Sequence, residues 1–188
     1  MTATLATTAE TKRTRLRDII AAKSLLTGRN FTLASGKPSG FFFDMKKTML
    51  DPEGANLIAD LMLDVLDKED VTHAGGLAMG AVPLVSALCV KSFQRGRPLG
   101  CFYVRKETKD HGTESLVDGY LEKGARVAIL EDVTTTGGSA LKAVGAVTAQ
   151  GATTSLVMSI VDRLEGAQDA FHTQGLRLVS LFTRDDFN

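Results

Sequence analysis

Short, continuous apolar runs alternate with stretches of helical pattern from Val71 to the C-terminus. Uninterrupted Val, Ile and Leu are typical of strands that are buried on both faces, and strands that alternate with helices build parallel sheets. The sequence therefore predicts an α/β fold, with a doubly wound, mainly parallel sheet and helices on both of its faces. The predicted strands cover 71–76, 101–104, 127–130, 155–161 and 176–182, and the predicted helices cover 82–93 and 139–150.

The N-terminal part predicts two helices with a hairpin between them, an addition over residues 10–66 that we call the hood. Apolar residues recur at helical spacing over 10–27, and Asp51-Pro52 is a good N-cap and first-turn pair for a helix that runs through Leu66. Between them the stretch FTLASGKPSGFFFDMKK (31–47) mixes short apolar pieces with Ser, Gly and Pro. This pattern indicates a hairpin that lies outside the core.

The size and charge of the chain limit its domains and partners. With 188 residues, of which 44% are hydrophobic, we expect a single domain over 1–188, with about 1–10 flexible. Lys plus Arg and Asp plus Glu both number 22, so no net charge attracts nucleic acid or an acidic membrane. We therefore expect partners of neither kind, and a charged ligand has to be met by a local cluster of side chains.

The cysteines and the N-terminus bear on the cell compartment. Cys89 and Cys101 lack the spacing of a metal site and fit a reduced cytosolic chain better than a secreted one held by disulfides. The first residues, MTATLATTAETKRTRLR, lack the apolar segment of a signal peptide, and no run of ~18 apolar residues occurs. We expect a soluble, cytoplasmic protein.

The stretch VAILEDVTTTGGS (127–139) places two adjacent acids, Glu131 and Asp132, after an apolar strand. In an open parallel sheet, ligands bind beyond the carboxyl ends of the strands, so we expect both carboxylates to face the ligand. The run from Thr134 to Ser139 then opens a helix, where hydroxyls, backbone N–H groups and the helix dipole favour a phosphate. A ribose 5-phosphate suits both features, because its hydroxyls can donate hydrogen bonds to the carboxylates.

Other nucleotide motifs are missing from the sequence. Neither G-x-G-x-x-G nor G-x-x-x-x-G-K-[ST] occurs, so dinucleotide and P-loop sites are not indicated. An accidental turn rich in Thr and Gly would explain the turn but not the paired acids.

The segment RKETKDHGTESLVDG (105–119) joins two predicted strands and is almost wholly polar. An exposed connection is the ordinary interpretation of such a loop. This one, however, concentrates four basic side chains near its start, and long loops are often functional lids. We expect a mobile cationic lid over 105–119. Its basic side chains are Arg105, Lys106, Lys109 and His111.

The stretch LEDVTTTGGSA closely resembles the 5-phosphoribosyl 1-pyrophosphate (PRPP) signature of type I phosphoribosyltransferases. Three further stretches resemble the orotate phosphoribosyltransferase family in particular, and they occur in the order of that family: FTLASGKPSGFFFD, YVRKETKDHG and the pair Asp162-Arg163. The resemblance covers the chain from about Leu25 to the C-terminus. It implies the type I phosphoribosyltransferase fold and a glycosyltransferase that joins orotate to PRPP, giving orotidine 5′-monophosphate and pyrophosphate in pyrimidine biosynthesis.

The resemblance also implies roles for single residues. Lys109, His111 and Asp132 would be catalytic. The basic lid residues would contact pyrophosphate, and Lys106, Lys109 and His111 would reach the site of the neighbouring subunit in a homodimer. Mg²⁺ would be bound mainly through PRPP or pyrophosphate, with no direct protein ligand.

Other implied contacts concern the base and the phosphate. Arg163 would hydrogen-bond orotate or its carboxylate, Thr135 would touch the ring edge, and Phe42 and Phe43 would cover the base. The expected substrate contacts together are Arg105, Lys106, Lys109, His111, Glu131, Asp132, Val133, Thr134, Thr135, Thr136, Gly137, Gly138, Ser139, Arg163, Phe42 and Phe43.

Two places depart from the better-known bacterial members of the family, which have lysine where this chain has Ala34 and in the loop that reads GGLAMGAVP (75–83). Gly76 through Gly80 can still offer backbone N–H groups to pyrophosphate, and Lys37 is a candidate replacement for the first lysine. Two alternatives stay open. One is a phosphoribosyltransferase for another base, such as a purine, and the other is a PRPP-sensing regulator without catalysis.

Overall fold

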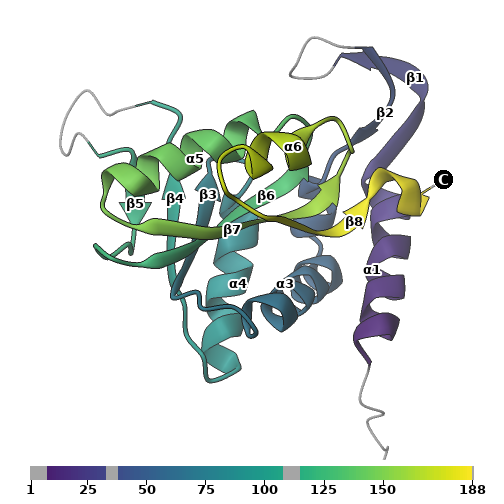
Figure 1. The fold of residues 1–188 in the computed structure, drawn as a ribbon. Helices are drawn as coiled ribbons and strands as arrows, with labels where there is room; N and C mark the ends of the chain where they lie inside the picture. Colours follow the sequence, from purple (N-terminus) through teal and green to yellow (C-terminus); the bar gives the residue numbers. More distant parts are fainter. Residues whose placement is uncertain (1–7, 33–37, 108–114, 188) are drawn as a thin grey trace, which may run out of the picture.

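A six-stranded sheet forms the centre of the computed structural model, which describes residues 8–32, 38–107 and 115–187 (Figure 1). The strand order is β5-β4-β3-β6-β7-β8, and neighbours run parallel except for the antiparallel pair β4 and β5. The mainly parallel sheet predicted from the sequence is therefore confirmed. Its strands are β3 (His73–Leu77), β4 (Gly100–Val104), β5 (Val117–Gly119), β6 (Arg126–Thr134), β7 (Thr153–Asp162) and β8 (Leu178–Thr183).

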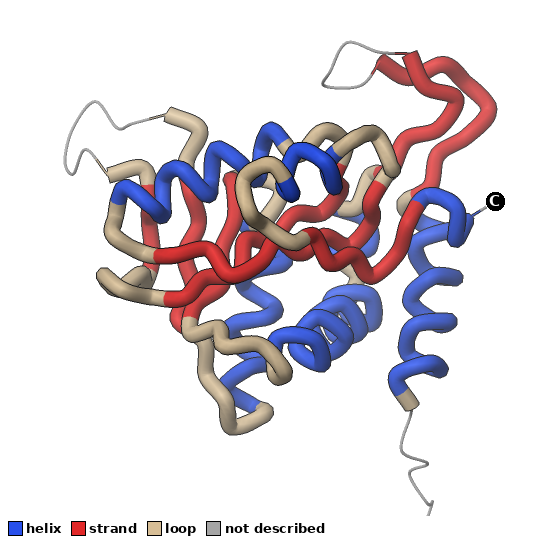
Figure 2. The backbone as a smooth tube through the Cα atoms, viewed as in Figure 1, coloured by secondary structure: helices blue, strands red, loops and turns tan. Residues whose placement is uncertain are grey.

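Helices cover both faces of this sheet (Figure 2). The central strand β6 shows why, because its successive side chains point to opposite faces. Val127 and Ile129 are fully buried in a cluster with α5 and α6, whereas Ala128 and Leu130 are fully buried in a cluster with α1, α3 and α4. The helices are α1 (Ala9–Lys23), α3 (Pro52–Leu66), α4 (Val82–Gln94), α5 (Gly138–Ala149) and α6 (Ala167–His172).

The predicted hood consists of α1, a two-stranded antiparallel hairpin and α3. The hairpin strands are β1 (Leu25–Thr32) and β2 (Pro38–Phe43), followed by the short α2 (Lys46–Met49). The prediction that the hairpin lies outside the core is wrong at its base, because Phe43 is 5% exposed and belongs to the core. The predicted helix 10–27 is also too long. It ends at Lys23, since Leu25 pairs with Phe43 in the hairpin.

The structure adds elements that the sequence analysis did not predict. The expected lid 105–119 ends in β5, an edge strand that pairs with β4, so its last residues belong to the sheet. Helix α6 and the C-terminal 3-10 turn η1 (Arg184–Phe187) are further additions. Helix α1 begins at Ala9, inside the segment 1–10 that was expected to be flexible, and residues 1–7 lie outside the described ranges. None of the described helices is both long and apolar enough to cross a bilayer.

Candidate functional site

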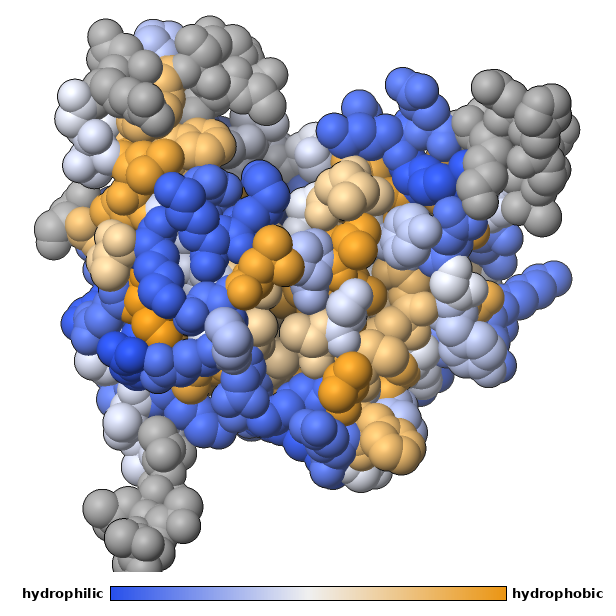
Figure 3. Space-filling view, turned by 180° about the vertical axis from the view of Figure 1, so that it is seen from behind, coloured by the Kyte–Doolittle hydropathy of each residue, from blue (hydrophilic) through white to orange (hydrophobic). Residues whose placement is uncertain are grey.

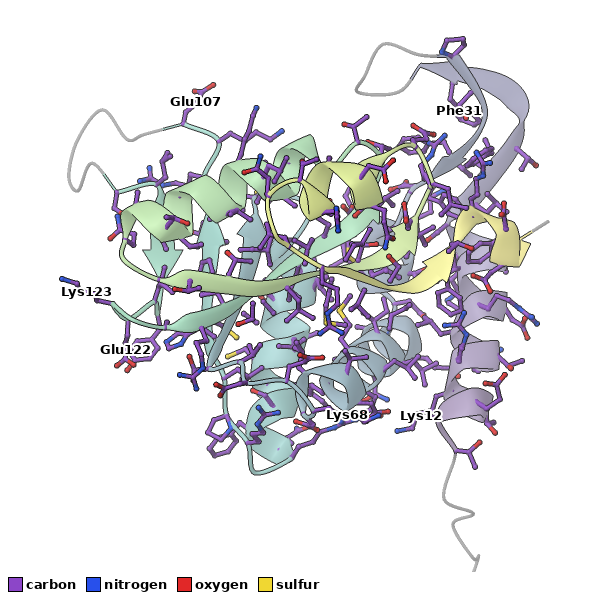
Figure 4. The ribbon with its side chains drawn as sticks, in the orientation of Figure 1. Lys12, Phe31, Lys68, Glu107, Glu122 and Lys123 are labelled. Atoms are coloured by element: carbon purple, nitrogen blue, oxygen red, sulfur yellow. The ribbon has the colours of Figure 1, made fainter. Side chains whose placement is uncertain are left out.

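A pocket of about 140 Å³ lies beyond the carboxyl ends of β3 and β6. In Figure 4 this edge of the sheet lies between the hairpin, marked by Phe31, and the loop after β4, marked by Glu107. The prediction that ligands bind at the carboxyl ends of the strands agrees with this position. The pocket is lined by Leu77, Ala78, Met79, Gly80, Ala81, Lys106, Leu130, Glu131, Asp132, Val133 and Ser139.

Glu131 lies inside strand β6, whereas the sequence analysis placed it after the strand. Its side chain is 8% exposed, and it accepts hydrogen bonds from the Thr134 hydroxyl at 2.9 Å and from the backbone N–H of Ala140. Burial raises the pKa of Glu131 to about 7, the hydrogen bonds oppose the rise, and the charge of Asp132 adds to it. Through these hydrogen bonds Glu131 links the end of β6 to the first turn of α5.

Asp132 is the more accessible of the two acids. Its Oδ1 accepts a hydrogen bond from the N–H of Val133 at 2.9 Å. Burial raises its pKa, and the charge of Asp44 acts in the same direction, while Lys46 opposes it. The backbone of Gly80 lies against this carboxylate, because a Cβ at Gly80 would lie 3.0 Å from Asp132 Oδ1. The loop after β3 and the acid of β6 thus form two adjoining walls of the pocket.

The start of α5 is the place at which the sequence predicts a phosphate cradle. Gly137 has φ +81°, and a Cβ there would lie 2.7 Å from Phe171, so both the backbone angle and the space require glycine. A second pocket, of about 250 Å³, opens on this loop. The sequence analysis did not single out Lys142, one α-helical turn beyond Gly138, which adds a positive charge there. The lining residues are Glu131, Val133, Thr135, Thr136, Gly137, Gly138, Ser139 and Lys142.

Thr134 differs from its predicted role. Its side chain is fully buried and donates to Glu131, so its hydroxyl supports the cradle and cannot reach a phosphate in this conformation. The carbonyl of Thr134 also accepts from the N–H of Arg163 at 2.9 Å. Through this bond the signature loop and the end of β7 lie side by side.

The loop after β3 has no lysine, but it offers backbone N–H groups that an anion could bind. The N–H groups of Ala78 and Ala81 donate to Val104 and Leu77. Within the ranges that the structure describes, the N–H groups of Met79 and Gly80 have no backbone acceptor. Because both residues line the 140 Å³ pocket, these donors can serve an anion. The Ala78–Met79 peptide bond is cis.

The start of the predicted lid is anchored to the sheet. Arg105 Nε lies 3.1 Å from Asp118 Oδ2, and the guanidinium also donates to the carbonyl of Ser115. Arg105 therefore binds other residues of the protein, whereas the family resemblance implied that it contacts pyrophosphate. Lys106 is exposed and lines the pocket, as its predicted role requires. Lys109 and His111 lie outside the described residues, as do Ala34 and Lys37 of the hairpin.

Arg163 is only 3% exposed, at the carboxyl end of β7. Its Nη2 donates to Ser39 Oγ at 2.9 Å and lies 2.9 Å from Glu165 Oε1. Its guanidinium lies 4.4 Å from the centre of the Phe41 ring. None of these three partners is predicted from the sequence. Arg163 therefore joins the hairpin of the hood to the edge of the sheet at which the paired acids lie.

The three consecutive phenylalanines of β2 divide between its two faces. Phe41 contacts Arg163, and it meets Phe43 edge to face with ring centres 5.8 Å apart. Phe42 stacks on Phe31 of β1, with ring centres 5.7 Å apart. The prediction that Phe42 and Phe43 together cover a base is wrong, because neighbouring residues of a strand point to opposite faces and Phe43 is in the core. The alternation of side chains along β2 could have separated Phe42 from Phe41 and Phe43, but not shown which face turns to the sheet.

Known proteins resemble the chain over almost its whole length. No family model matches it. It is 49% identical over 179 residues to an orotate phosphoribosyltransferase of Rhodopseudomonas palustris. This match covers 93% of this chain and 95% of the relative. A crystal structure of Mycobacterium tuberculosis orotate phosphoribosyltransferase in complex with Fe(III) dicitrate matches with a TM-score of 0.83 and 35% identity, over 94% of this chain and 99% of that one. The same enzyme in complex with PRPP matches with a TM-score of 0.79 and 33% identity, over 94% and 98% of the two chains.

These likenesses extend over almost the whole chain. The sequence left open transfer to another base and PRPP sensing without catalysis, and both of these two enzymes are named for orotate. An adenine phosphoribosyltransferase of Leishmania tarentolae shares the fold, with a TM-score of 0.66 but only 19% identity, over 92% of this chain and 89% of that one. With its acid pair, phosphate cradle and PRPP signature at the carboxyl edge of a type I phosphoribosyltransferase sheet, the chain belongs to the orotate phosphoribosyltransferase family.

Proposed function

We propose that the chain carries out the reaction of its family, in which the 5-phosphoribosyl group of PRPP passes to orotate and pyrophosphate leaves. The observation that carries this proposal is that two pockets adjoin: one is lined by Asp132 and the loop after β3, the other by the α5 cradle, and both are lined by Glu131, Val133 and Ser139. The product is orotidine 5′-monophosphate, so the reaction belongs to pyrimidine biosynthesis. The proposal includes a single phosphoribosyltransferase domain over 1–188 that works in the cytoplasm.

The ribose 5-phosphate occupies the cradle and the adjoining acid. Its phosphate lies at the N-terminus of α5, where the N–H groups of the first turn, the hydroxyls of Thr136 and Ser139 and the charge of Lys142 favour an anion. Asp132 accepts hydrogen bonds from the ribose hydroxyls. Glu131 contributes mainly by keeping the loop in shape, since two protein donors already occupy its carboxylate.

Pyrophosphate leaves at the side of the pocket formed by the loop after β3. The open N–H groups of Met79 and Gly80 and the ammonium of Lys106 stabilise the negative charge that builds up on it. Lys109 and His111 are proposed to add to this charge from the lid, as the family resemblance implies. Closure of the lid also excludes water, which would otherwise compete with orotate for the cation-like ribose carbon.

Mg²⁺ is part of the proposal. The carboxylate oxygens of Asp132 are hard donors beside the place of the pyrophosphate, and this suits a cation that keeps much of its water and binds mainly through substrate oxygens. When bound, Mg²⁺ offsets negative charge on the departing pyrophosphate. Asp132 would hold it through water or through the ribose hydroxyls.

Orotate binds between Arg163 and the signature loop. The buried guanidinium of Arg163 meets the negative charge of the base, and Thr135 in the neighbouring loop lies within the second pocket, where it can contact the ring edge. Phe41 supports the guanidinium from the hairpin side. The hood thereby sets the position of the base relative to the ribose.

A homodimer completes the proposal. Helix α4 exposes an apolar strip, with Val90 60% and Phe93 74% exposed, and Met79 of the loop before it is 74% exposed. Figure 3, which views the molecule from behind, shows apolar side chains gathered across the middle of that face. A second copy that covers this strip would place its lid near the pocket, as the family resemblance implies. Light scattering should give a dimer mass for the parent and a monomer mass for Phe93→Glu, while Gln94→Glu stays dimeric.

A substrate panel tests the reaction itself. The purified chain, supplied with PRPP and Mg²⁺, should consume orotate and leave uracil, adenine and guanine unchanged. Consumption of a purine in place of orotate would assign the fold to another base. PRPP binding without consumption of any base would favour the sensing alternative.

A further inference from the structure

Arg163 keeps two partners on a single nitrogen. Nη2 donates a hydrogen bond to Ser39 Oγ at 2.9 Å, and Glu165 Oε1 lies 2.9 Å from the same atom as an ion-pair partner. The Nε atom of the same guanidinium is buried and has no hydrogen-bond partner among the described residues. A buried donor without an acceptor is costly, so Nε is a position at which a ligand oxygen would be stabilising.

A guanidinium can bind a carboxylate with two parallel hydrogen bonds in two ways. The side-on mode uses Nε and Nη2, and the end-on mode uses Nη1 and Nη2. Both modes use Nη2, and in Arg163 this nitrogen already donates to Ser39 and has the Glu165 carboxylate 2.9 Å away. In either mode, a carboxylate that arrives from outside therefore meets the carboxylate of Glu165 at Nη2.

We propose that Glu165 is an internal competitor for the carboxylate of orotate, which replaces Glu165 on Nη2 when the base binds. The inference rests on the proposed function, since it assumes that orotate binds at Arg163. It assigns to Glu165 a part in substrate specificity. An uncharged base leaves the ion pair between Glu165 and Arg163 in place, whereas a base with a carboxylate exchanges one negative partner for another.

The loop around Glu165 allows this exchange without a change of the backbone. The N–H of Leu164 donates to Asp162 Oδ1 at 2.9 Å, which fixes the turn after β7. The Glu165 side chain is 22% exposed, in contrast to the 3% of its partner Arg163. Rotation of the Glu165 side chain is therefore enough to move its carboxylate into water. Ser39 keeps its hydrogen bond to Nη2, so the guanidinium stays attached to the hairpin.

Glu165→Gln separates competition from simple support of Arg163. The variant keeps the length and the hydrogen-bonding oxygen of the side chain but removes the negative charge that competes with orotate. If Glu165 competes, a ligand with a carboxylate gains affinity in the variant, because the buried guanidinium lacks a counter-ion until the ligand supplies one. If Glu165 only holds Arg163 in place, the same ligand loses affinity.

The test compares two nucleotides that differ only in that carboxylate. Dissociation constants of orotidine 5′-monophosphate and uridine 5′-monophosphate are measured by calorimetry on the parent, Glu165→Gln and the control Asp169→Asn. Asp169 is an exposed acid of α6, four residues further on. The ratio of the two constants should favour orotidine 5′-monophosphate roughly fivefold more in Glu165→Gln than in the parent, as expected for removing one partly exposed charge. The control should leave the ratio unchanged.

The ratio remains informative if the variant is less stable, because both constants come from one sample and a loss of folded protein affects both equally. As a second measurement, orotidine 5′-monophosphate should raise the melting temperature of Glu165→Gln more than that of the parent. An unchanged or smaller ratio in Glu165→Gln would overturn the inference. If the parent bound neither nucleotide and consumed no orotate, the proposed function would fail first, and the inference would fail with it.

Discussion

Thr134 donates its hydroxyl proton to Glu131 over 2.9 Å, and both side chains are buried beneath the start of α5. Both residues belong to the end of β6, where the signature loop begins, so the acid and the hydroxyl together fix the start of that loop. Glu131 is thus a structural residue of the loop. Its titration should then appear in the stability of the protein.

Glu131→Gln should change how stability depends on pH. The folded protein raises the pKa of Glu131 from an ordinary 4.5 to about 7, so between these values the folded state binds more protons than the unfolded state. The free energy of unfolding of the parent therefore falls as pH rises through this window. The variant lacks this loss. Its stability relative to the parent should increase by up to about 3 kcal/mol between pH 4 and pH 8, measured by urea unfolding. A constant difference across that range would contradict the raised pKa.

Gly137→Ala should damage both the fold and PRPP binding. The substitution forces a side chain into a backbone with φ +81° and places its Cβ 2.7 Å from Phe171. We expect a loss of roughly 2 kcal/mol in unfolding free energy and weaker PRPP binding in calorimetry.

Gly145→Ala is the matched control on the same helix. A Cβ at Gly145 meets nothing within 4 Å, so alanine should stabilise α5 by about 0.5–1 kcal/mol and leave PRPP binding unchanged. If both alanine variants behaved alike, the special geometry assigned to Gly137 would be wrong.

Asp60→Asn should weaken the contacts between the helices beneath the sheet and lower the stability of the protein. Asp60 of α3 is buried, and its carboxylate lies within ion-pair distance of Lys12, Lys91 and Arg95. Lys12 projects from α1 toward α3 in Figure 4. Removal of the charge leaves these cations without their common partner, at a cost of about 2 kcal/mol in thermal or urea unfolding.

The charge state of Asp60 gives this prediction a pH dependence. Burial raises its pKa, but the hydrogen bonds from Arg95, Lys12 and Lys91 outweigh burial, so the pKa lies below its ordinary value. The stabilisation is therefore present above pH ~4 and disappears as pH falls through the folded pKa. Asp64→Asn, which breaks a more exposed pair with Arg95, should cost less than about 1 kcal/mol. An equal cost for the two variants would show that burial of Asp60 adds nothing.

Arg105 and Asp118 should act as a unit in turnover. Their ion pair joins the first residue of the lid to β5, the edge strand in which the lid ends. We expect Arg105→Ala and Asp118→Ala each to lower kcat/KM about tenfold and the double variant to be no worse than the poorer single one. Multiplied losses in the double variant would mean that Arg105 acts on the substrate directly, as the sequence analysis expected. Asp70→Ala, which removes an exposed partner of Arg126, is the control with unchanged turnover.

Much of the sheet and the acid pair could be predicted from local pattern. Residues 127–139 show why, because a run of apolar residues, two acids and a helix start predict a strand, the edge of a sheet and the loop after it within a few positions. The end of the first helix was less certain, since Leu26 continues the helical spacing of Leu16 and Ile20, and only its pairing in the hairpin makes it part of a strand.

The base site could not be predicted from local pattern, because its contacts join distant parts of the chain. Arg163 and Ser39 are 124 positions apart, and no spacing in the sequence indicates that they meet. The three phenylalanines of β2 stand out in the sequence. Which of them face the sheet, however, depends on how the hairpin is turned toward it. The partner of Arg105 is likewise set by β5, a strand of three residues that carries too little pattern to predict.

The measurement that tests the central claim most directly is the loss of orotate absorbance by the folded parent and Asp132→Asn, each supplied with PRPP and Mg²⁺. The parent should consume orotate only when PRPP is present. Asp132→Asn should keep a melting temperature near that of the parent and lose at least about 100-fold in kcat/KM, because the acid beside the ribose acts on the reacting molecule. No loss of orotate with the folded parent, or equal turnover by both proteins, would contradict the account.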